Sequence, residues 1–285
     1  MVREPLNSSV GWGALAMTKR VLSASIVIPP LTLLLVFGPD YTLYIFVSVA
    51  AILGLYEFYN LTLPEQGTLG KIGGVVLGAI LCGVFQWAPH HAVISILGVI
   101  VLVLFLTSSL LSSELSSLPN RIGITFFGII YIPFLLSHFT LINKLPEGVL
   151  WVLLLVTTVW VGDTFALVVG SLWGRHKLCP QISPNKTVEG FVGCFVGAIL
   201  SIFCFKFLFL PTLAGKEALI AGSGIALFGQ LGDLSESMIK RGARVKDSGS
   251  LIPGHGGMLD RLDSLLFASP FLYYLLIYWI RPGAS

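Results

Sequence analysis

The sequence is poor in charged residues. Only 11% of its 285 residues are Asp, Glu, Lys or Arg, whereas 55% are hydrophobic, and the mean hydropathy is +0.90. Soluble domains carry about 25% charged residues, so this chain could not cover a water-soluble fold of its length with a polar surface. Lipid can solvate an apolar surface of that kind. The composition therefore excludes an ordinary soluble domain and predicts an integral membrane protein.

Cysteine is also scarce. The four cysteines show no C-x-x-C spacing, and three of them, Cys82, Cys194 and Cys204, lie in apolar runs. This placement is typical of thiols that act as small hydrophobic side chains. The pattern therefore argues against a disulfide framework and against a cysteine metal site.

Long apolar runs, by contrast, are abundant. A transmembrane helix needs about 20 mostly apolar residues, and nine segments approach or reach that length. They are 21–37, 41–61, 70–88, 92–112, 122–142, 149–173, 190–210, 217–239 and 262–280. We therefore expect an all-α polytopic membrane protein with about nine transmembrane helices, in contact with membrane lipid and without a nucleic-acid partner.

Lys and Arg are distributed unevenly between the loops. With the N-terminus inside, thirteen of the 17 fall on the inner side, and only Lys144, Lys216 and Arg281 fall outside. Cytoplasmic loops carry an excess of positive residues. We therefore expect a cytoplasmic N-terminus and place the long loops 174–189 and 240–261 in the cytoplasm, beside the inner membrane.

The chain is expected to divide into three parts. Residues 1–16 differ from the rest and suggest a tag or a disordered N-terminus. Residues 17–145 have short loops and few intramembrane charges, which favours a transmembrane scaffold with an oligomer contact, such as a homodimer. Residues 146–285 carry the two long inner loops and most of the unusual chemistry, so we interpret them as the catalytic region.

Paired acids stand out in that catalytic region. Asp233 and Glu236 are three residues apart on one helical face, and Asp260 and Asp263 repeat this spacing at the start of the next span. If the two helices pack antiparallel, the four carboxylates converge, and either a cation lies among them or some are protonated. Oxygen ligands without a histidine pair favour Mg²⁺ or Mn²⁺, in one or more copies. Plain ion pairs, such as Glu236 with Lys240, are the alternative.

Two further acids lie within predicted spans. Asp163 is deep in the sixth segment, and an isolated acid at membrane depth is a functional candidate, so we add it to the candidate metal ligands. Glu57 lies near the cytoplasmic end of the second segment, where a role as a structural partner is expected.

Basic residues and glycines follow the acids. Lys240, Arg241 and Lys246 precede the run "SGSLIPGHGG", whose backbone N–H groups, including those of Gly256 and Gly257, could approach an anion closely. This combination indicates a phosphate-binding site. Alternatively, the cations only fix the topology or contact anionic lipid headgroups.

Two other residues leave two interpretations open. In "SPNKTVEG", Lys186 either meets a nucleotide phosphate near a helix N-terminus or simply lies beside a helix that Thr187 caps. His255 either transfers a proton or holds the Gly-rich loop in place. The residues alone do not separate these roles.

The stretch from Ser237 to Asp263, "SMIKRGARVKDSGSLIPGHGGMLDRLD", resembles the signature of the phosphatidate cytidylyltransferases. "SPNKTVEG" and the stretch 162–175 are similar to features of the same family, so the likeness extends over roughly residues 160–264. The resemblance implies transfer of a cytidylyl group from CTP to phosphatidic acid, which gives CDP-diacylglycerol and pyrophosphate.

The resemblance also implies roles for individual residues. A lipid phosphate oxygen would attack the α-phosphorus of CTP while Asp233 and Asp260 hold a divalent metal ion. Glu236, Asp263 and Asp163 would complete the metal site, and Lys240 and Arg241 would act with it in catalysis. The expected substrate-binding residues are Lys186, Ser237, Lys246, His255, Gly256, Gly257 and Arg261.

Three other classes of protein compete with this interpretation. An ion-coupled transporter could use Asp163, but the other acids cluster near one surface instead of lining the midplane. Another CTP-using lipid enzyme, such as a polyprenol kinase, would release CDP instead of pyrophosphate. A membrane scaffold without activity would have little use for four converging acids.

Overall fold

The computed structural model describes residues 33, 37–39, 41–111, 116–249 and 256–281. Residues 1–42 and 43–285 form two compact units, and nearly all described residues belong to the second. The predicted N-terminal segment 1–16, almost all of the predicted first span and His255 lie outside the described residues.

Helices make up most of the second unit. They are α2 (Thr42–Thr62), α3 (Thr68–Trp87), α4 (His90–Leu111), α5 (Leu118–Ile129), α6 (His138–Asn143), α7 (Gly148–Trp173), α8 (Val188–Phe209), α9 (Gly215–Gly242) and α10 (Leu259–Leu275). Two π-helical segments, η1 (Ile130–Phe134) and η2 (Leu276–Ile280), continue α5 and α10.

In the described part of the chain, eight helices are long and apolar enough to cross a membrane. They coincide with the second to ninth predicted spans within a few residues. The segment η1 joins α5 and α6 into a single span, Leu118–Asn143, and η2 extends the last span to Ile280. The prediction of an all-α polytopic membrane protein is therefore confirmed.

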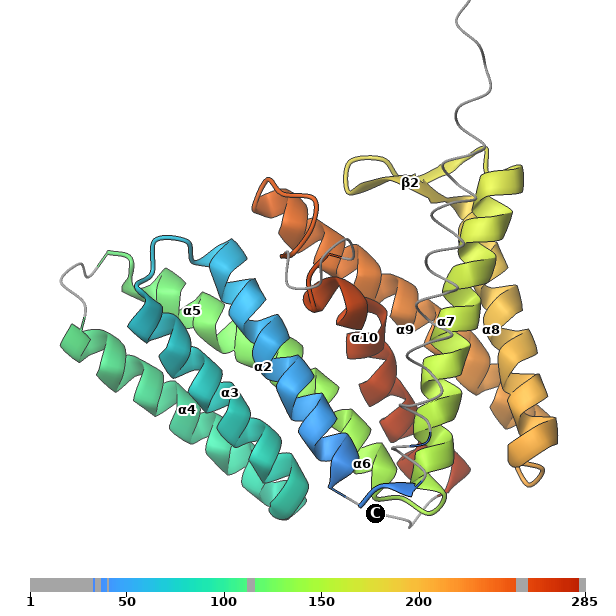
Figure 1. Ribbon diagram of the computed structural model, residues 1–285, viewed down its shortest axis with the longest axis horizontal. Helices are drawn as coiled ribbons and strands as arrows, with labels where there is room; N and C mark the ends of the chain where they lie inside the picture. The colour runs from blue at the N-terminus through green and yellow to red at the C-terminus, as the bar shows by residue number, and fades with distance from the viewer. Residues whose placement is uncertain (1–32, 34–36, 40, 112–115, 250–255, 282–285) are drawn as a thin grey trace, which may run out of the picture. The chain divides into compact units, whose positions relative to one another are not determined.

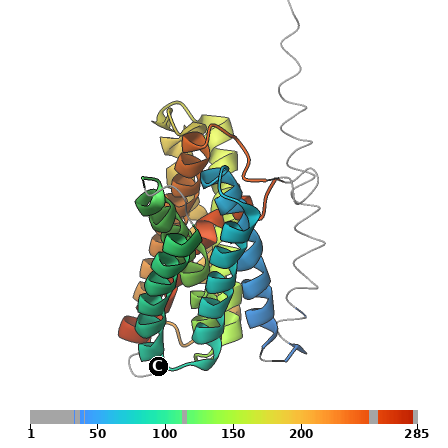
Figure 2. The ribbon, with the colours of Figure 1, turned by 90° about the vertical axis from the view of Figure 1, so that its left-hand side faces the viewer.

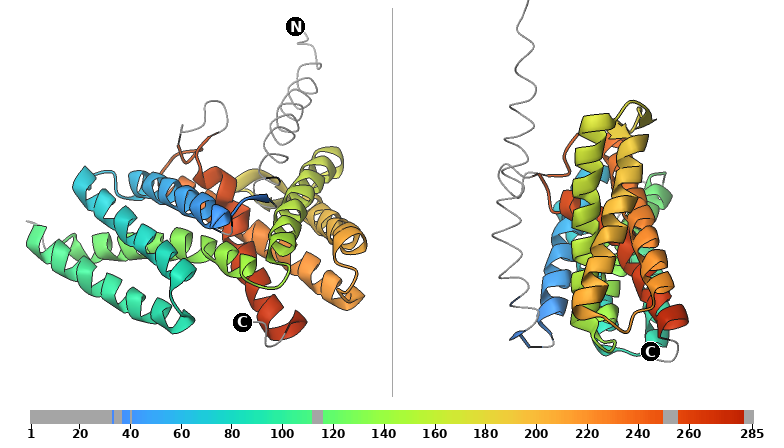
Figure 3. Two further views of the ribbon diagram at one scale, coloured as in Figure 1. Left: turned by 60° about the horizontal axis from the view of Figure 1, so that its bottom comes forward. Right: turned by 90° about the vertical axis from the view of Figure 1, so that its right-hand side faces the viewer.

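Within residues 43–285, α9 and α10 are central (Figure 1). α7 packs along α8, and α9 packs along both α8 and α10, an arrangement that the two views of Figure 3 also show. On the other side, α3 contacts α4 and α5, and Figure 2 shows these helices in front.

Two glycines allow α9 and α10 to approach each other closely. A Cβ atom at Gly232 would collide with the backbone oxygen of Asp263, and one at Gly224 would collide with the ring of Phe271. Small residues permit such close contact between membrane helices. Because Gly232 immediately precedes Asp233, this contact sets the acidic segments of the two helices side by side.

The loop before α8 contains a β-hairpin that the sequence analysis did not predict. β1 (Lys177–Cys179) pairs antiparallel with β2 (Ser183–Thr187), with Lys177 opposite Thr187. The strands are short and lack the alternation of apolar and polar residues by which a strand is recognised. Thr187 then caps α8 as predicted, since its side chain accepts a hydrogen bond from the backbone N of Gly190 at 3.1 Å.

Basic residues link other helix ends through hydrogen bonds and an ion pair. The ammonium group of Lys144 donates to the backbone oxygens of Phe85 and Gln86 at the end of α3, at 3.0 and 2.5 Å. The guanidinium of Arg281, after η2, pairs with Glu147 at the start of α7. Two of the three residues predicted on the outer side therefore have structural partners.

Candidate active site

The antiparallel pair α9 and α10 brings the predicted acids into one region. Asp233 and Glu236 lie on α9, and Asp263 lies on α10 with its backbone against Gly232 of α9. Asp163, on α7, lies near the same three acids. Asp263 is within electrostatic range of Asp163, Asp233 and Glu236, so a negative charge on Asp263 is repelled by theirs. Such a concentration of negative charge in a membrane protein is relieved by nearby cations or by protonation of some of the acids.

One of these cations is Lys240. Its ammonium nitrogen lies 2.5 Å from Oε2 of Glu236 and 2.6 Å from Oδ1 of Asp260, so it bridges α9 and α10. The side chain of Glu236 is fully buried, and its Oε1 has no hydrogen-bond partner among the described residues. Lys240 therefore neutralises a buried carboxylate that still has one unused oxygen.

Asp260 holds the Gly-rich loop. While Oδ1 meets Lys240, Oδ2 accepts hydrogen bonds from the backbone N of Ser248 (3.0 Å), the hydroxyl of Ser248 (2.9 Å) and the backbone N of Gly257 (2.8 Å). Both ends of the Gly-rich loop thus converge on one carboxylate. The amide of Gly257, a candidate phosphate ligand, is directed at Asp260 in this arrangement.

A second carboxylate holds the same loop from the other half of the protein. Glu57, on α2 and buried, accepts from the backbone N of Met258 and of Leu259, both at 2.9 Å, and from the hydroxyl of Ser248 at 3.1 Å. The structural role that the sequence suggested for Glu57 is therefore confirmed. Its partner Ser248, also buried, was not recognised from the sequence.

The glycines of the loop make room for these carboxylates. Gly256 has φ +76°, a left-handed conformation that glycine adopts without steric cost. A Cβ at Gly257 would collide with the hydroxyl of Ser248 and with the carboxylate of Glu57. Gly256 and Gly257 thus allow close packing of the loop backbone on Asp260 and Glu57.

Lys186 is the second cation of the site. It lies on β2, and its ammonium nitrogen is 2.7 Å from Oδ2 of Asp233. The hydroxyl of Ser237 lies 3.5 Å from the other oxygen of Asp233, one helical turn away on α9. The β-hairpin therefore positions Lys186 beside the acidic cluster, where it pairs with Asp233.

Asp163 has a polar partner that the sequence analysis missed. The side-chain amide of Gln230, on α9, donates to Oδ1 of Asp163 at 3.3 Å and lies 3.6 Å from the sulfur of Cys194. Gln230 is buried and lies three residues before Asp233. A glutamine at membrane depth, on the face of a helix that carries acids, was the available signal.

The remaining candidate residues lie at the edge of the cluster. Arg241 donates from Nε to the backbone oxygen of Ile182 (3.1 Å) and from a terminal nitrogen to that of Val245 (3.0 Å), so it fixes the β-hairpin to the end of α9. Lys246 and Arg261 have exposed side chains. Both are basic groups within a few residues of Ser248 and Asp260.

The donor chemistry of the cluster suits a hard divalent cation, although no such site is assembled in this arrangement. Among the described residues, no three His, Cys, Asp or Glu side chains are grouped as metal ligands, and lysines pair with Asp233, Glu236 and Asp260. The unused Oε1 of buried Glu236 and the repulsion around Asp263 nevertheless fit the needs of Mg²⁺ or Mn²⁺.

Comparison with known proteins agrees with this chemistry. A family model described as "Cytidylyltransferase family" matches residues 18–279. A protein of Bacillus subtilis named phosphatidate cytidylyltransferase is 34% identical over 231 residues, which cover 81% of this chain and 79% of that protein. One of Thermotoga maritima with the same name is 33% identical over 266 residues, or 89% and 94% of the two chains. One of Staphylococcus aureus is 33% identical over 254 residues, or 82% and 90%.

Proposed function

This chain belongs to the cytidylyltransferase family, and we propose that it transfers the cytidylyl group of CTP to phosphatidic acid, forming CDP-diacylglycerol and releasing pyrophosphate. One observation carries the proposal. Lys186 from the β-hairpin and Lys240 from α9 lie over a cluster of carboxylates at one end of the bundle. Cations of this kind are needed to bind a triphosphate, and the carboxylates to bind its metal ion.

We place the site at the cytoplasmic face of the inner membrane. The chain is a multi-pass membrane protein, and most of its Lys and Arg fall on the side that carries the β-hairpin and the Gly-rich loop. CTP is a cytosolic nucleotide, and the phosphate of phosphatidic acid lies at the membrane surface. A site at this end of the helices can therefore receive both substrates.

The basic residues have separate tasks in this proposal. Lys186 and Lys240 exchange a carboxylate for a phosphate oxygen when CTP enters, since phosphate is a comparable anionic partner. Arg241 keeps the β-hairpin, and with it Lys186, beside α9. The exposed cations Lys246 and Arg261 neutralise the lipid headgroup.

The reaction is an in-line displacement. An oxygen of the phosphatidate phosphate forms a bond to the α-phosphorus of CTP, and the bond from that phosphorus to the oxygen bridging to the β-phosphorus breaks, releasing pyrophosphate. The attacking oxygen is already anionic, so no strong general base is required. Lys240, held between Glu236 and Asp260, is positioned to offset charge on the phosphates.

Asp233 and Asp260 would hold a divalent cation, with Glu236, Asp263 and Asp163 around it. Mg²⁺ or Mn²⁺ bound there would supply positive charge that offsets the charge of the phosphates and of the leaving pyrophosphate. We also propose that residues 17–145 form the contact of a homodimer, which light scattering in detergent tests.

Label transfer from CTP to lipid tests the proposed activity. The purified protein is incubated with phosphatidic acid and CTP labelled on its α-phosphate, with and without Mg²⁺. We expect label in the lipid fraction and equimolar pyrophosphate only when metal and phosphatidic acid are both present. Release of CDP instead would indicate a CTP-dependent kinase, and intact CTP under all conditions would reject the proposed function.

A further inference from the structure

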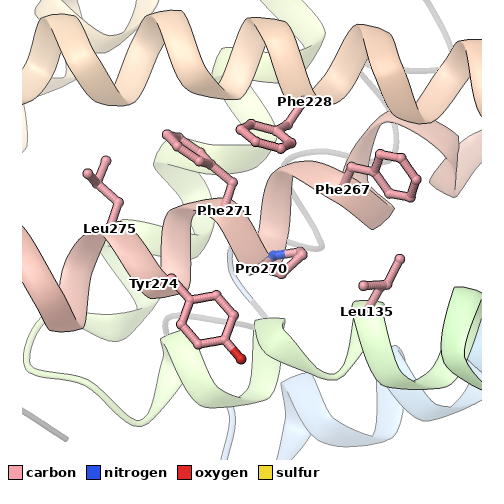
Figure 4. Close-up of a pocket in the computed structure, with 7 residues that line it drawn as sticks. All are labelled: Leu135, Phe228, Phe267, Pro270, Phe271, Tyr274 and Leu275. Atoms are coloured by element: carbon pink, nitrogen blue, oxygen red, sulfur yellow. The ribbon is translucent and has the colours of Figure 1, made fainter.

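An apolar groove runs along α10 (Figure 4). Its volume is about 500 Å³, and its lining includes Phe267, Pro270, Phe271 and Tyr274 of α10, Phe228 of α9 and Leu135 just after η1. The rings of Phe228 and Phe271 stack with centroids 4.8 Å apart across the two helices. These side chains are only partly buried, so the groove opens on the outside of the bundle.

The groove begins close to the proposed active site. Phe267 is four residues after Asp263, and Phe228 is five residues before Asp233. At 1.5 Å per residue, the near end of the groove is therefore roughly 6–8 Å along the helices from the carboxylates. The far end, at Leu275, lies about 12 Å beyond Phe267, which approaches the roughly 15 Å depth of hydrocarbon in one leaflet.

Tyr131 lies between the groove and the acids. Its ring meets that of Phe267 edge-on, with centroids 6.1 Å apart, and its hydroxyl is within electrostatic range of Glu236, Asp263 and Asp233. The side chain is only 3% exposed, and its hydroxyl has no hydrogen-bond partner among the described residues. A buried hydroxyl without a partner is costly, so this one is suited to a ligand.

We infer that the groove binds an acyl chain of the lipid substrate, and that the hydroxyl of Tyr131 donates a hydrogen bond to an ester or phosphate oxygen of the same lipid. This inference rests on the proposed function. The lipid comes from the bilayer through the open side of the groove. Its chain lies along α10, and its phosphate then reaches the region of Asp233 and Asp263.

The groove is expected to orient the lipid substrate more than to increase its binding affinity. An acyl chain in the bilayer is already surrounded by hydrocarbon, so moving it into the groove gains no hydrophobic free energy. Close packing against Phe228, Phe267 and Phe271 instead restricts the directions in which the headgroup can point, which favours productive alignment. A helix from a second copy of the protein could also fill the groove, but that contact would not explain the adjacent Tyr131 hydroxyl.

Substrates of different chain length test this assignment. Leu275→Trp fills the far end of the groove. We expect kcat/KM for dioleoyl phosphatidate to fall about fivefold because its chain loses packing there. The kcat/KM for dihexanoyl phosphatidate should stay within about twofold of the wild-type value, because its short chains do not extend that far. Leu106→Trp, on the exposed side of α4, is the matched control and should change neither. Equal effects on both lipids, or none, would overturn the inference.

Tyr131→Phe tests the near end of the groove. We expect kcat/KM to fall about tenfold for both lipids, the usual range for one buried hydrogen bond, with the KM for CTP unchanged. A variant as active as the wild type would remove the hydroxyl from the lipid site. Because Phe keeps the ring and its packing on Phe267, the fold should be retained, which thermal unfolding checks.

Photolabelling gives a readout that does not depend on turnover. A phosphatidate with a diazirine at the end of one acyl chain should label peptides of α10 around Leu275, and unlabelled dioleoyl phosphatidate should compete. Labelling spread evenly over the lipid-exposed helices would overturn the inference. So would a change from dimer to monomer caused by Leu275→Trp, since the groove would then be a contact between copies.

Failure of the groove and failure of the proposed function are distinguishable. Competed labelling of α10 by a protein that transfers no label from CTP would reject the proposed activity and support the groove as a lipid site. Normal transfer to both lipids by Leu275→Trp and Tyr131→Phe would reject the groove and support the activity.

Discussion

The carboxylate of Glu57 accepts a hydrogen bond from the backbone N of Leu259 at 2.9 Å, across 202 residues of sequence. Glu57 belongs to the half of the chain expected to be a scaffold, and Leu259 begins the helix that carries Asp260 and Asp263. The contact therefore fixes where α10 starts. Through it, the N-terminal half takes part in shaping the site beside the carboxylates of α9 and α10.

Replacing Glu57 should disturb the Gly-rich loop. In Glu57→Gln, the side-chain amide would present N–H groups to the N–H donors of Met258 and Leu259, so at least one hydrogen bond to a charged group is lost, at about 1.5–3 kcal/mol each. We expect a lower midpoint of thermal unfolding and a fall in kcat of roughly tenfold or more.

Glu65→Gln is the matched control for this variant, because Glu65 is exposed in the turn after α2. It should behave as the wild type in both assays. Limited proteolysis between Lys240 and Leu259 should become faster in Glu57→Gln only. Unchanged proteolysis and activity would show that Asp260 alone is sufficient to hold the loop.

Gly257 should tolerate no side chain. A Cβ there would collide with Ser248 and Glu57, so Gly257→Ala must displace the loop or break the hydrogen bonds to Glu57, at a cost of about 1–3 kcal/mol for strain of this kind. Cytidylyl transfer should fall by at least tenfold. Gly242→Ala, where no atom lies within 4 Å of the added methyl group, should remain active, and equal activity of both variants would contradict the loop packing described above.

The spans were predictable from the sequence because each depends on local composition. Eight apolar runs reappear as helices, and the spacing of Asp233 with Glu236 places two acids on one side of α9 whatever surrounds them. Which helix lies beside them depends on contacts between distant residues. The approach of Asp263 follows from Gly232, whose role only the packed structure reveals.

The parts that could not be predicted depend on long-range contacts. The β-hairpin has no apolar alternation, yet Arg241 and the pair Lys186–Asp233 hold it against α9. Tyr131 lies in a sequence that is apolar throughout, so nothing local distinguishes it from a core tyrosine. Its significance comes from a hydroxyl that has no hydrogen-bond partner in the described part of the chain and lies near acids of two other helices.

Lys240 should have a structural and a catalytic role that can be separated. Lys240→Met leaves Glu236 and Asp260 facing each other without a cation, and breaking a buried ion pair in this way costs about 3–5 kcal/mol. The double variant Glu236→Gln, Lys240→Met removes one of the two charges and should recover much of that stability. Glu236→Gln alone is the reference for activity: if Lys240 also binds phosphate, the double variant should be much less active than Glu236→Gln, whereas equal activity of the two would limit Lys240 to neutralising Glu236.

Activity should depend on a divalent cation. Removal of metal with EDTA should abolish label transfer, and Mg²⁺ should restore it. Asp263→Asn should raise the Mg²⁺ concentration for half-maximal activity by about 10–100-fold, the range seen when residues around a metal site are changed. Asp247→Asn, at an exposed loop position, is the control and should leave the Mg²⁺ dependence unchanged. Full activity in EDTA would remove the metal from the mechanism.

Lys186 should matter for CTP more than for the lipid. Lys186→Ala removes the cation that β2 places 2.7 Å from Asp233, so the KM for CTP should rise by roughly tenfold, as expected for one charge-assisted contact to phosphate. Lys177→Ala is the matched control, because Lys177 lies on the opposite strand of the same hairpin with an exposed side chain. A rise in the KM for CTP in Lys186→Ala, with the KM for phosphatidate and the Mg²⁺ dependence unchanged, would place Lys186 on the nucleotide, whereas an unchanged KM for CTP would limit it to neutralising Asp233.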